Sequence, residues 1–182
     1  MPNDLILGEQ LRVRFHWVED RFAHAIELKL GPETVTLLTS CEGTSQQRWP
    51  PSPPLQQLHV AELAPDRRAA LLLGMAGNSH WSLSVEAERS RPELIFDVAC
   101  RVHRRPEQLG SRYRGFGDVA AHSTNELTLK PHSAQERVTV TASKCEGETR
   151  IRCEGDDLVI ACCAAGTSLP QTLRWKYRVA LG

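Results

Sequence analysis

The chain has 182 residues, of which 41% are hydrophobic and 24% charged, and its 22 basic and 22 acidic side chains give a formal net charge of zero. This composition excludes a disordered chain, which combines low hydrophobicity with high net charge. It also argues against a general nucleic-acid binder, because phosphate contacts require an excess of basic side chains. The length suits one sizeable core, so we expect a single domain over residues 1–182.

The N-terminal residues, MPNDLILGEQ, lack the basic region and the apolar stretch of a secretory signal. The longest apolar run, residues 69–75, is interrupted by Gly74 and is far shorter than the roughly 20 residues that a membrane helix needs. We therefore expect a cytoplasmic protein that does not associate with a membrane.

Residues 11–17 and 22–30 alternate between apolar and polar side chains, with Glu19 and Asp20 between the two runs. Successive side chains of a strand point to opposite faces, so this period of two predicts a half-buried hairpin. His24 falls on the apolar stripe, which is typical of a core histidine rather than a ligand. His24 also belongs to one candidate site cluster, the second beside the polar face described below, whose other members are Trp17, Asp20, Arg21 and Trp49.

Residues 48–54, RWPPSPP, form a proline-rich run. Because proline cannot donate to a ladder, the run predicts an extended crossover inside one domain. A ligand for SH3 or WW domains is the functional alternative. Trp49 is interpreted either as an exposed aromatic platform or as a plug at the edge of the sandwich.

The middle of the chain contains apolar runs at residues 55–63 and 70–73, with a turn expected at residues 65–68. Residues 65–75 leave room for one or two helical turns, since Pro65 suits the first position of a helix. Residues 109–119 are rich in glycine and aromatic side chains, which indicates an irregular loop or a bulged edge strand.

Further alternating runs continue to the C-terminus and are separated by turn signals at residues 146–148 and 154–157. About ten to twelve short strands with few helix signals predict an all-β protein, an antiparallel β-sandwich with a β-barrel as the alternative. Residues 173–181 place an apolar stripe opposite Arg174, Lys176 and Arg178. If this basic face lies at a sheet edge it discourages strand pairing, so we expect a monomer or a weak homodimer.

The most informative stretch pairs residues 80–86 with residues 94–102 as a hairpin, with Val85 set opposite Leu94. One face is then wholly apolar, as burial requires. The other face collects a polar set: Asn78, His80, Ser82, Ser84, Asp97 and Arg101.

Three interpretations of this polar face stay open. It is a solvated surface with an Asp97–Arg101 ion pair, a platform for a ligand, or a catalytic group of a serine with His80 and Asp97. The catalytic interpretation is the weakest, because Ser82 and His80 lie two residues apart on one rigid strand and no G-x-S-x-G turn is present.

The six cysteines show no C-x-x-C spacing. In a reducing compartment most should act as small buried hydrophobic residues, so we expect six reduced thiols, no zinc and no cofactor. Zinc bound by Cys145, Cys153 and the Cys162–Cys163 pair is the weaker alternative, because structural sites usually have closely spaced ligand pairs.

A local basic run at residues 101–105 is followed by Arg112 and Arg114, with Tyr113 and Phe116 between and beyond them. Basic and aromatic side chains alternate in this way in grooves that bind single-stranded nucleic acid. One such patch in a chain of zero net charge makes nucleic-acid binding the lesser expectation.

Three segments, RFHWVEDRFAH, RWPPSPPLQQL and GNSHWSLSVE followed by LIFDVACR, resemble a set of uncharacterised bacterial proteins of similar length. That set has no established activity, so the resemblance implies a free-standing domain and transfers no site residue.

The residues favour a non-catalytic binding module for a carbohydrate or a small polar metabolite. Its expected ligand-binding residues are Asn78, His80, Ser82, Asp97, Arg101 and Trp49. A sugar-active enzyme with His80 and Asp97 as acid–base residues is one alternative. A scaffold for protein–protein interaction, using the proline run or an apolar patch, is the other.

Overall fold

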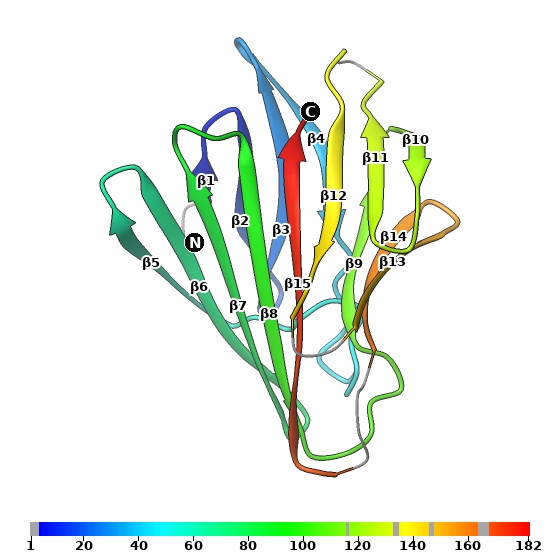
Figure 1. Ribbon diagram of the computed structural model, residues 1–182. Coiled ribbons are helices and arrows are strands. Elements are labelled where there is room, and N and C mark those ends of the chain that lie inside the picture. The colour runs from blue at the N-terminus through cyan, green and yellow to red at the C-terminus, as the bar shows by residue number, and fades with distance from the viewer. Residues whose placement is uncertain (1–3, 116, 133–134, 146–147, 164–167) are drawn as a thin grey trace.

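The computed structural model describes residues 4–115, 117–132, 135–145, 148–163 and 168–182. Over these residues the regular elements are all β-strands, arranged in two antiparallel sheets that lie face to face (Figure 1). The expected antiparallel β-sandwich is therefore confirmed, with fifteen strands instead of the ten to twelve expected.

The seven-stranded sheet runs in the order β1 (Leu5–Gly8), β2 (Leu11–Val18), β3 (Arg21–Leu30), β4 (Glu33–Ser40), β9 (Gly110–Gly115), β14 (Asp157–Cys163) and β13 (Glu148–Glu154). The eight-stranded sheet runs in the order β10 (Asp118–His122), β11 (Glu126–Lys130), β12 (Val138–Ser143), β15 (Gln171–Leu181), β8 (Glu93–Val102), β7 (Ser79–Glu88), β6 (Arg67–Ala76) and β5 (Gln57–Ala64).

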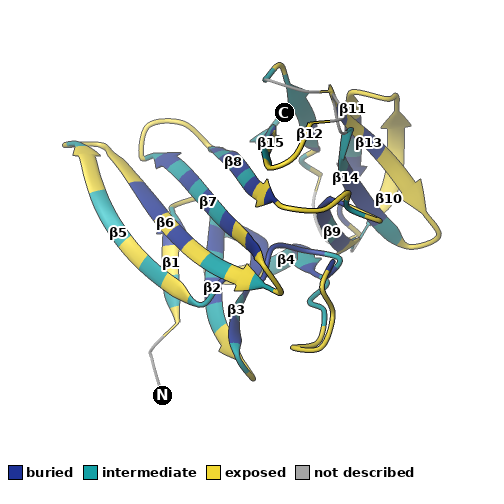
Figure 2. Cartoon of the chain, turned by 90° about the horizontal axis from the view of Figure 1, so that it is seen from below, coloured by how far each residue is buried: buried dark blue, intermediate teal, exposed yellow. Residues whose placement is uncertain are grey.

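The core follows directly from the alternating sequence pattern. On β7 and β8 every second residue is buried, and the alternation appears as stripes along both strands in Figure 2. The inward side chains of both sheets form one hydrophobic cluster, whose largest fully buried members include Trp81, Trp175, Phe15 and Phe96. Burial of this apolar surface is the main force that holds the sheets together.

Three segments differ from what the sequence predicted. The suggested helical turns at residues 65–75 are wrong, because β6 is a strand throughout. Residues 110–115 form β9, which is paired on both sides by β4 and β14 and is not at an edge. β15 lies between β12 and β8, so its basic face is not at an edge either. The monomer or weak homodimer, which was inferred partly from such an edge, stays a prediction.

The β7–β8 pairing is shifted by two residues from the predicted register. Val85 lies opposite Phe96, and Ala87 lies opposite Leu94. Because β7 extends to Glu88, the predicted register would have set Ala87 opposite Pro92, whose missing N–H cannot donate to the ladder. The observed register leaves Pro92 in the loop after β7. A shift of two residues keeps each side chain on its face and changes only its cross-strand neighbours.

The proline run crosses from one sheet to the other, as expected. Leu55 accepts a hydrogen bond from the Phe22 N–H at 2.7 Å, and Gln56 donates to the Leu73 carbonyl at 2.8 Å. Ser52 is buried, and its Oγ donates to the Arg112 carbonyl and accepts from the Arg112 N–H. Most of the run is buried, so it does not offer an exposed ligand for SH3 or WW domains.

A buried polar network joins the two sheets through the core. The Nε2 atom of His24 on β3 lies 2.8 Å from the hydroxyl of Tyr113 on β9. That hydroxyl is hydrogen-bonded to the hydroxyl of Tyr177 on β15. Beside it, Trp175 Nε1 donates to Ser111 Oγ at 3.0 Å. Unpaired polar groups are costly in such a core, so these bonds fix how the sheets align.

Tyr113→Phe should destabilise the protein more than Tyr177→Phe. The first change removes the hydroxyl that His24 and Tyr177 share, whereas the second leaves the His24–Tyr113 bond intact. Each buried group left unpaired costs about 1–3 kcal/mol. Urea unfolding measures the difference, and equal free energies of unfolding for the two variants would contradict this assignment.

Gly74→Ala should also destabilise the protein, because an added Cβ would lie 1.7 Å from the carbonyl oxygen of Pro54. To remove this steric clash the crossover must move away from β6, and overpacking of this kind lowers the free energy of unfolding by about 1–3 kcal/mol. Gly115→Ala is the matched control, since the nearest atoms to its added Cβ are 3.8 Å away. Equal melting temperatures for the two variants would show that the crossover is not packed as described.

Candidate functional site

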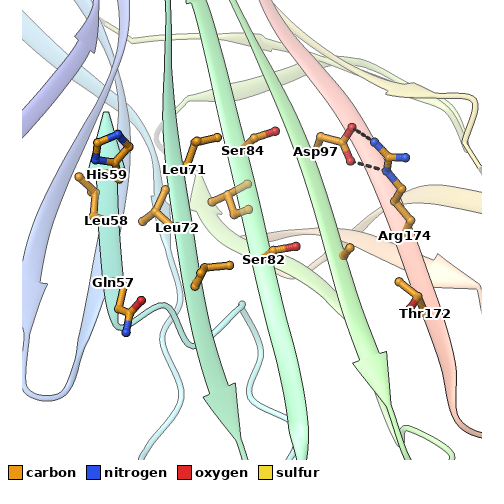
Figure 3. A pocket seen from close by; sticks show the side chains of 13 residues that line it. Gln57, Leu58, His59, Leu71, Leu72, Ser82, Ser84, Asp97, Thr172 and Arg174 are labelled. Atoms are coloured by element: carbon orange, nitrogen blue, oxygen red, sulfur yellow. Dashed lines mark hydrogen bonds and ion pairs between the residues drawn. The ribbon is translucent and has the colours of Figure 1, made fainter. Parts of the chain in front are cut away.

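A large open cavity lies on the outer face of the eight-stranded sheet. We call it the sheet groove; its volume is about 770 Å³, and it crosses β5, β6, β7, β8 and β15 (Figure 3). Its lining residues are Gln57, Leu58, His59, Leu71, Leu72, Leu73, Ser82, Leu83, Ser84, Asp97, Ala99, Thr172 and Arg174.

Strand register builds the groove from two neighbouring rows of outward side chains. One row is Gln57, Leu73, Ser82, Ala99 and Arg174, in which each residue is the cross-strand partner of the next. The other row is His59, Leu71, Ser84, Asp97 and Lys176. Directly opposed side chains in antiparallel sheets lie about 5 Å apart, so each row forms a continuous surface.

The groove changes character from one side to the other. On β6 the side chains are apolar and open to solvent: Leu71 is 41% exposed and Leu73 is 54% exposed. On β7 the same rows carry Ser82 and Ser84, and beyond them lie Asp97 and Arg174 (Figure 3). A ligand here meets an apolar surface at one end, hydroxyl groups in the middle and an ion pair at the other end.

The ion pair is well defined. Asp97 accepts a hydrogen bond from Arg174 Nε at 2.7 Å and a second from Arg174 Nη2, in the two-bond geometry typical of arginine and carboxylate. Lys176 Nζ lies 3.7 Å from the same carboxylate. The Asp97 side chain is only 15% exposed, so its charge faces these two cations and not open solvent.

The Asp97–Arg101 ion pair suggested by the sequence is replaced by this one. Arg174 comes from the adjacent strand as a diagonal neighbour of Asp97, at about 7–8 Å, whereas Arg101 lies four residues along the same strand, at about 13 Å. Arg101 instead lies opposite His80 in the β7–β8 ladder. Both residues are exposed and neither lines the groove, although Thr172, the partner of Arg101 on β15, does.

The predicted site residues therefore separate into groups. Ser82 and Asp97 line the groove, together with Ser84 from the same polar face. His80 and Arg101 lie on that face but outside the lining. Asn78 belongs to the turn before β7 and lines a separate pocket of about 40 Å³. Trp49 is only 8% exposed and its carbonyl accepts from Gln108 at 2.8 Å, so it is a plug and not a platform.

The sequence pattern did not indicate the apolar side of the groove. Leu71 and Leu73 belong to an uninterrupted apolar run that shows no period of two, so nothing in the sequence separates its outward from its inward residues. It also missed the role of Arg174. The basic alternation on β15 was visible, but its acidic partner could be identified only from the β8–β15 register.

The second predicted cluster does not form a single site. Asp20 and Arg21 pair with each other at 2.8 Å, and His24 lies in the core. Trp17 is 41% exposed and packs edge-on against Phe22 at the β2–β3 turn. This exposed tryptophan is on the other sheet from the groove.

A buried carboxylate near this turn was not anticipated. Ser40 Oγ donates to Glu42 Oε1 at 2.6 Å, and burial raises the pKa of Glu42 to about 7 against the opposing effects of Ser40 and Arg21. Burial also lowers the pKa of His24 to about 3, so its imidazole is neutral at physiological pH. These groups line none of the cavities described above, so we assign them to stability.

Metal and nucleic-acid sites receive no support from the geometry. Across the part of the chain that the structure describes, no group of three or more His, Cys, Asp or Glu side chains is placed to bind a metal ion. Tyr113 is fully buried, while Arg112 and Arg114 both pair with Asp157. Tyr113 therefore offers no stacking surface, although the Arg114 side chain is exposed, and Phe116 lies outside the described residues.

Comparisons of the chain with protein-family models, with curated proteins and with solved structures found no match. The resemblance to bacterial proteins of similar length stays a prediction. Among the described residues there is no helix long and apolar enough to cross a membrane.

Stability should depend on pH through two opposing groups. The pKa of Glu42 rises on folding from its ordinary 4.5 to about 7, so its stabilising effect is present below pH 4.5 and is lost as pH rises through 7. The pKa of His24 falls from 6.5 to about 3, so stability is lost as pH falls below 6.5.

Glu42→Gln removes the pH dependence of stability that arises from the raised pKa of Glu42. Relative to wild type, the variant should gain stability between pH 5 and 8, by at most about 1.4 kcal/mol per pH unit. Urea unfolding across this range measures the gain. Glu33→Gln, a change at an exposed carboxylate of β4, is the control. Parallel pH profiles for wild type and Glu42→Gln would exclude the proposed protonation of Glu42 in the folded state.

Proposed function

We propose that this protein is a non-catalytic binding module and that the sheet groove holds its ligand, a small molecule with an apolar part and a hydrogen-bonding part. The observation that carries the proposal is a cavity of about 770 Å³ with leucines at one side and, at the other, an ion pair between a mostly covered Asp97 and a half-exposed Arg174. Small-molecule sites typically measure about 300–1,000 Å³ and combine an apolar lining with a few placed polar groups.

The leucine side of the groove supports an apolar ligand part. Leu71 and Leu73 are large side chains about half exposed on a flat sheet face, and covering them removes apolar surface from water. Each square ångström of apolar surface buried stabilises a complex by about 25 cal/mol before the costs of association. An apolar group lying across β6 would obtain most of its affinity there.

The opposite side of the groove supports a polar ligand part. Ser82 and Ser84 can donate and accept hydrogen bonds, and the Asp97–Arg174 pair presents charge of both signs. This set suits a head group with hydroxyl, amide or zwitterionic character. The groove lining contains no Trp, Tyr or Phe, on which a sugar ring would stack, so a small metabolite is favoured over a carbohydrate.

The alternatives have less support. His80 lies outside the groove lining, and both carboxylate oxygens of Asp97 accept hydrogen bonds from Arg174, which does not favour an acid–base pair of these two residues. A protein scaffold that used the proline run would need an exposed segment, whereas most of that run is buried.

A thermal-shift screen tests the proposal, because a ligand that binds only the folded state raises the melting temperature. The compounds are simple sugars, polar metabolites without an apolar group, and amphipathic metabolites such as aromatic amino acids and short-chain acids. We expect stabilisation by members of the amphipathic set. Stabilisation by sugars alone would replace the metabolite with a carbohydrate, and no stabilisation by any set would contradict the groove as a ligand site.

Variants then locate the binding. Leu73→Ser and Asp97→Asn should each raise the dissociation constant of a confirmed ligand about tenfold, which corresponds to about 1.4 kcal/mol of binding free energy. Titration calorimetry measures this change. Leu63→Ser and Arg101→Ala are matched controls, since Leu63 is similarly exposed but neither residue lines the groove. If the controls weaken binding as much as the groove variants do, the ligand binds elsewhere.

A further inference from the structure

Two thiols meet at one backbone carbonyl of β15. Cys145, in the segment after β12, places its Sγ 3.2 Å from the carbonyl oxygen of Arg174. Cys162, on β14 of the opposite sheet, places its Sγ 3.6 Å from the same oxygen. The distance between the two sulfurs cannot exceed the sum of these two distances.

A further contact supports this proximity. Cys145 Sγ lies 3.6 Å from Thr149 Oγ1, and Thr149 is the direct cross-strand partner of Cys162 in the β13–β14 ladder. Side chains of directly opposed residues stand about 5 Å apart on the same face. Cys145 is therefore held beside Cys162 by contacts with two different strands.

The other cysteines are less suited to pairing. Cys163 follows Cys162 on a strand, so its side chain points to the opposite face. Burial raises the pKa of Cys100, and Cys162 is near enough to raise it further, but Cys100 is wholly buried away from an oxidant. Cys153 is exposed on β13. Cys41 lies just after β4 in the other half of the seven-stranded sheet.

We propose that Cys145 and Cys162 form a reversible disulfide when the protein meets a peroxide. The reduced thiols are the resting state, and the bond would join the β12–β13 connection to β14 beside β15. The shared contacts keep the two sulfur atoms close, but disulfides also require the two Cβ atoms to lie within about 4.5 Å. Side-chain rotation leaves Cβ atoms in place, so any remaining gap must be closed by a shift of the segment after β12. This inference concerns a modification site and does not depend on the ligand of the sheet groove.

The reaction is balanced with the peroxide as oxidant. The Cys145 thiolate attacks one peroxide oxygen, the O–O bond breaks, and the departing hydroxide takes a proton to become water. The sulfenic acid left on Cys145 is then attacked by the Cys162 sulfur, which loses its proton. The S–S bond forms, the S–O bond breaks, and a second water leaves.

The order of the two steps follows from the surroundings of each thiol. Cys162 packs against the core, and burial raises its pKa to about 12, with smaller contributions from Cys145 and Cys163. A thiol that is rarely a thiolate reacts slowly with peroxide. Cys145 is not part of the buried cluster, so it is the thiol that meets the oxidant first and Cys162 is the one that resolves the sulfenic acid.

The test uses the full chain, reduced and then treated with dilute hydrogen peroxide. After the remaining thiols are alkylated in acid, peptide mass mapping identifies any cross-link. We expect one intramolecular disulfide between Cys145 and Cys162, with the loss of two hydrogen masses, reversal by a thiol reductant and a raised melting temperature of the oxidised protein.

Single Cys→Ser variants provide the controls. The cross-link should vanish in Cys145→Ser and persist in Cys163→Ser and Cys153→Ser, each checked for its fold by circular dichroism. Wild-type mapping alone decides the matter if a variant fails to fold. A cross-link between any other two cysteines, a cross-link between chains, or six free thiols after peroxide has oxidised a reference dithiol would overturn the proposal.

Discussion

The hydroxyl of Tyr113 is the point on which the alignment of the two sheets depends. It lies in the fully buried core and is hydrogen-bonded both to His24 of its own sheet and to Tyr177 of the other. Hydrophobic burial is non-directional and would allow the sheets to slide over each other. A buried hydrogen-bonded pair allows no such freedom, because any shift leaves costly unpaired groups.

This constraint reaches the outer surface through β15. Tyr177 and Trp175 point inward and are fixed by hydrogen bonds, so the residues that alternate with them must point outward. Arg174 is one of these, and the register with β8 places it beside Asp97. The charged end of the sheet groove is thus positioned by the polar network on the other face of the same strand.

The groove and the thiol pair use different parts of one residue. The guanidinium of Arg174 lines the groove, whereas its carbonyl oxygen is approached by Cys145 and Cys162. The leucine side of the groove lies at the opposite end, on the hairpin of β5 and β6, where the crossover packs closely against Gly74. The groove therefore spans the sheet from the edge hairpin of β5 and β6 to the central strand β15.

The sequence by itself determined the fold class, the β2–β3 and β7–β8 hairpins, the crossover and the inward face of most strands. These follow from local rules: a period of two, turn residues, and proline that cannot join a ladder. It also identified Ser82 and Asp97 as residues of a polar face. For β6 the same rules failed, because an apolar run without alternation does not show which side chains point outward.

Only the tertiary structure decided which strands are neighbours and in which register. The order of strands placed β15 in the middle of its sheet and paired Asp97 with Arg174 and not with Arg101. It also buried Trp49 and brought Cys145, in the connection after β12, to Cys162 on β14. The physical reason is that a strand's pattern specifies which face each side chain takes, whereas its neighbours are selected by contacts between residues far apart in the chain.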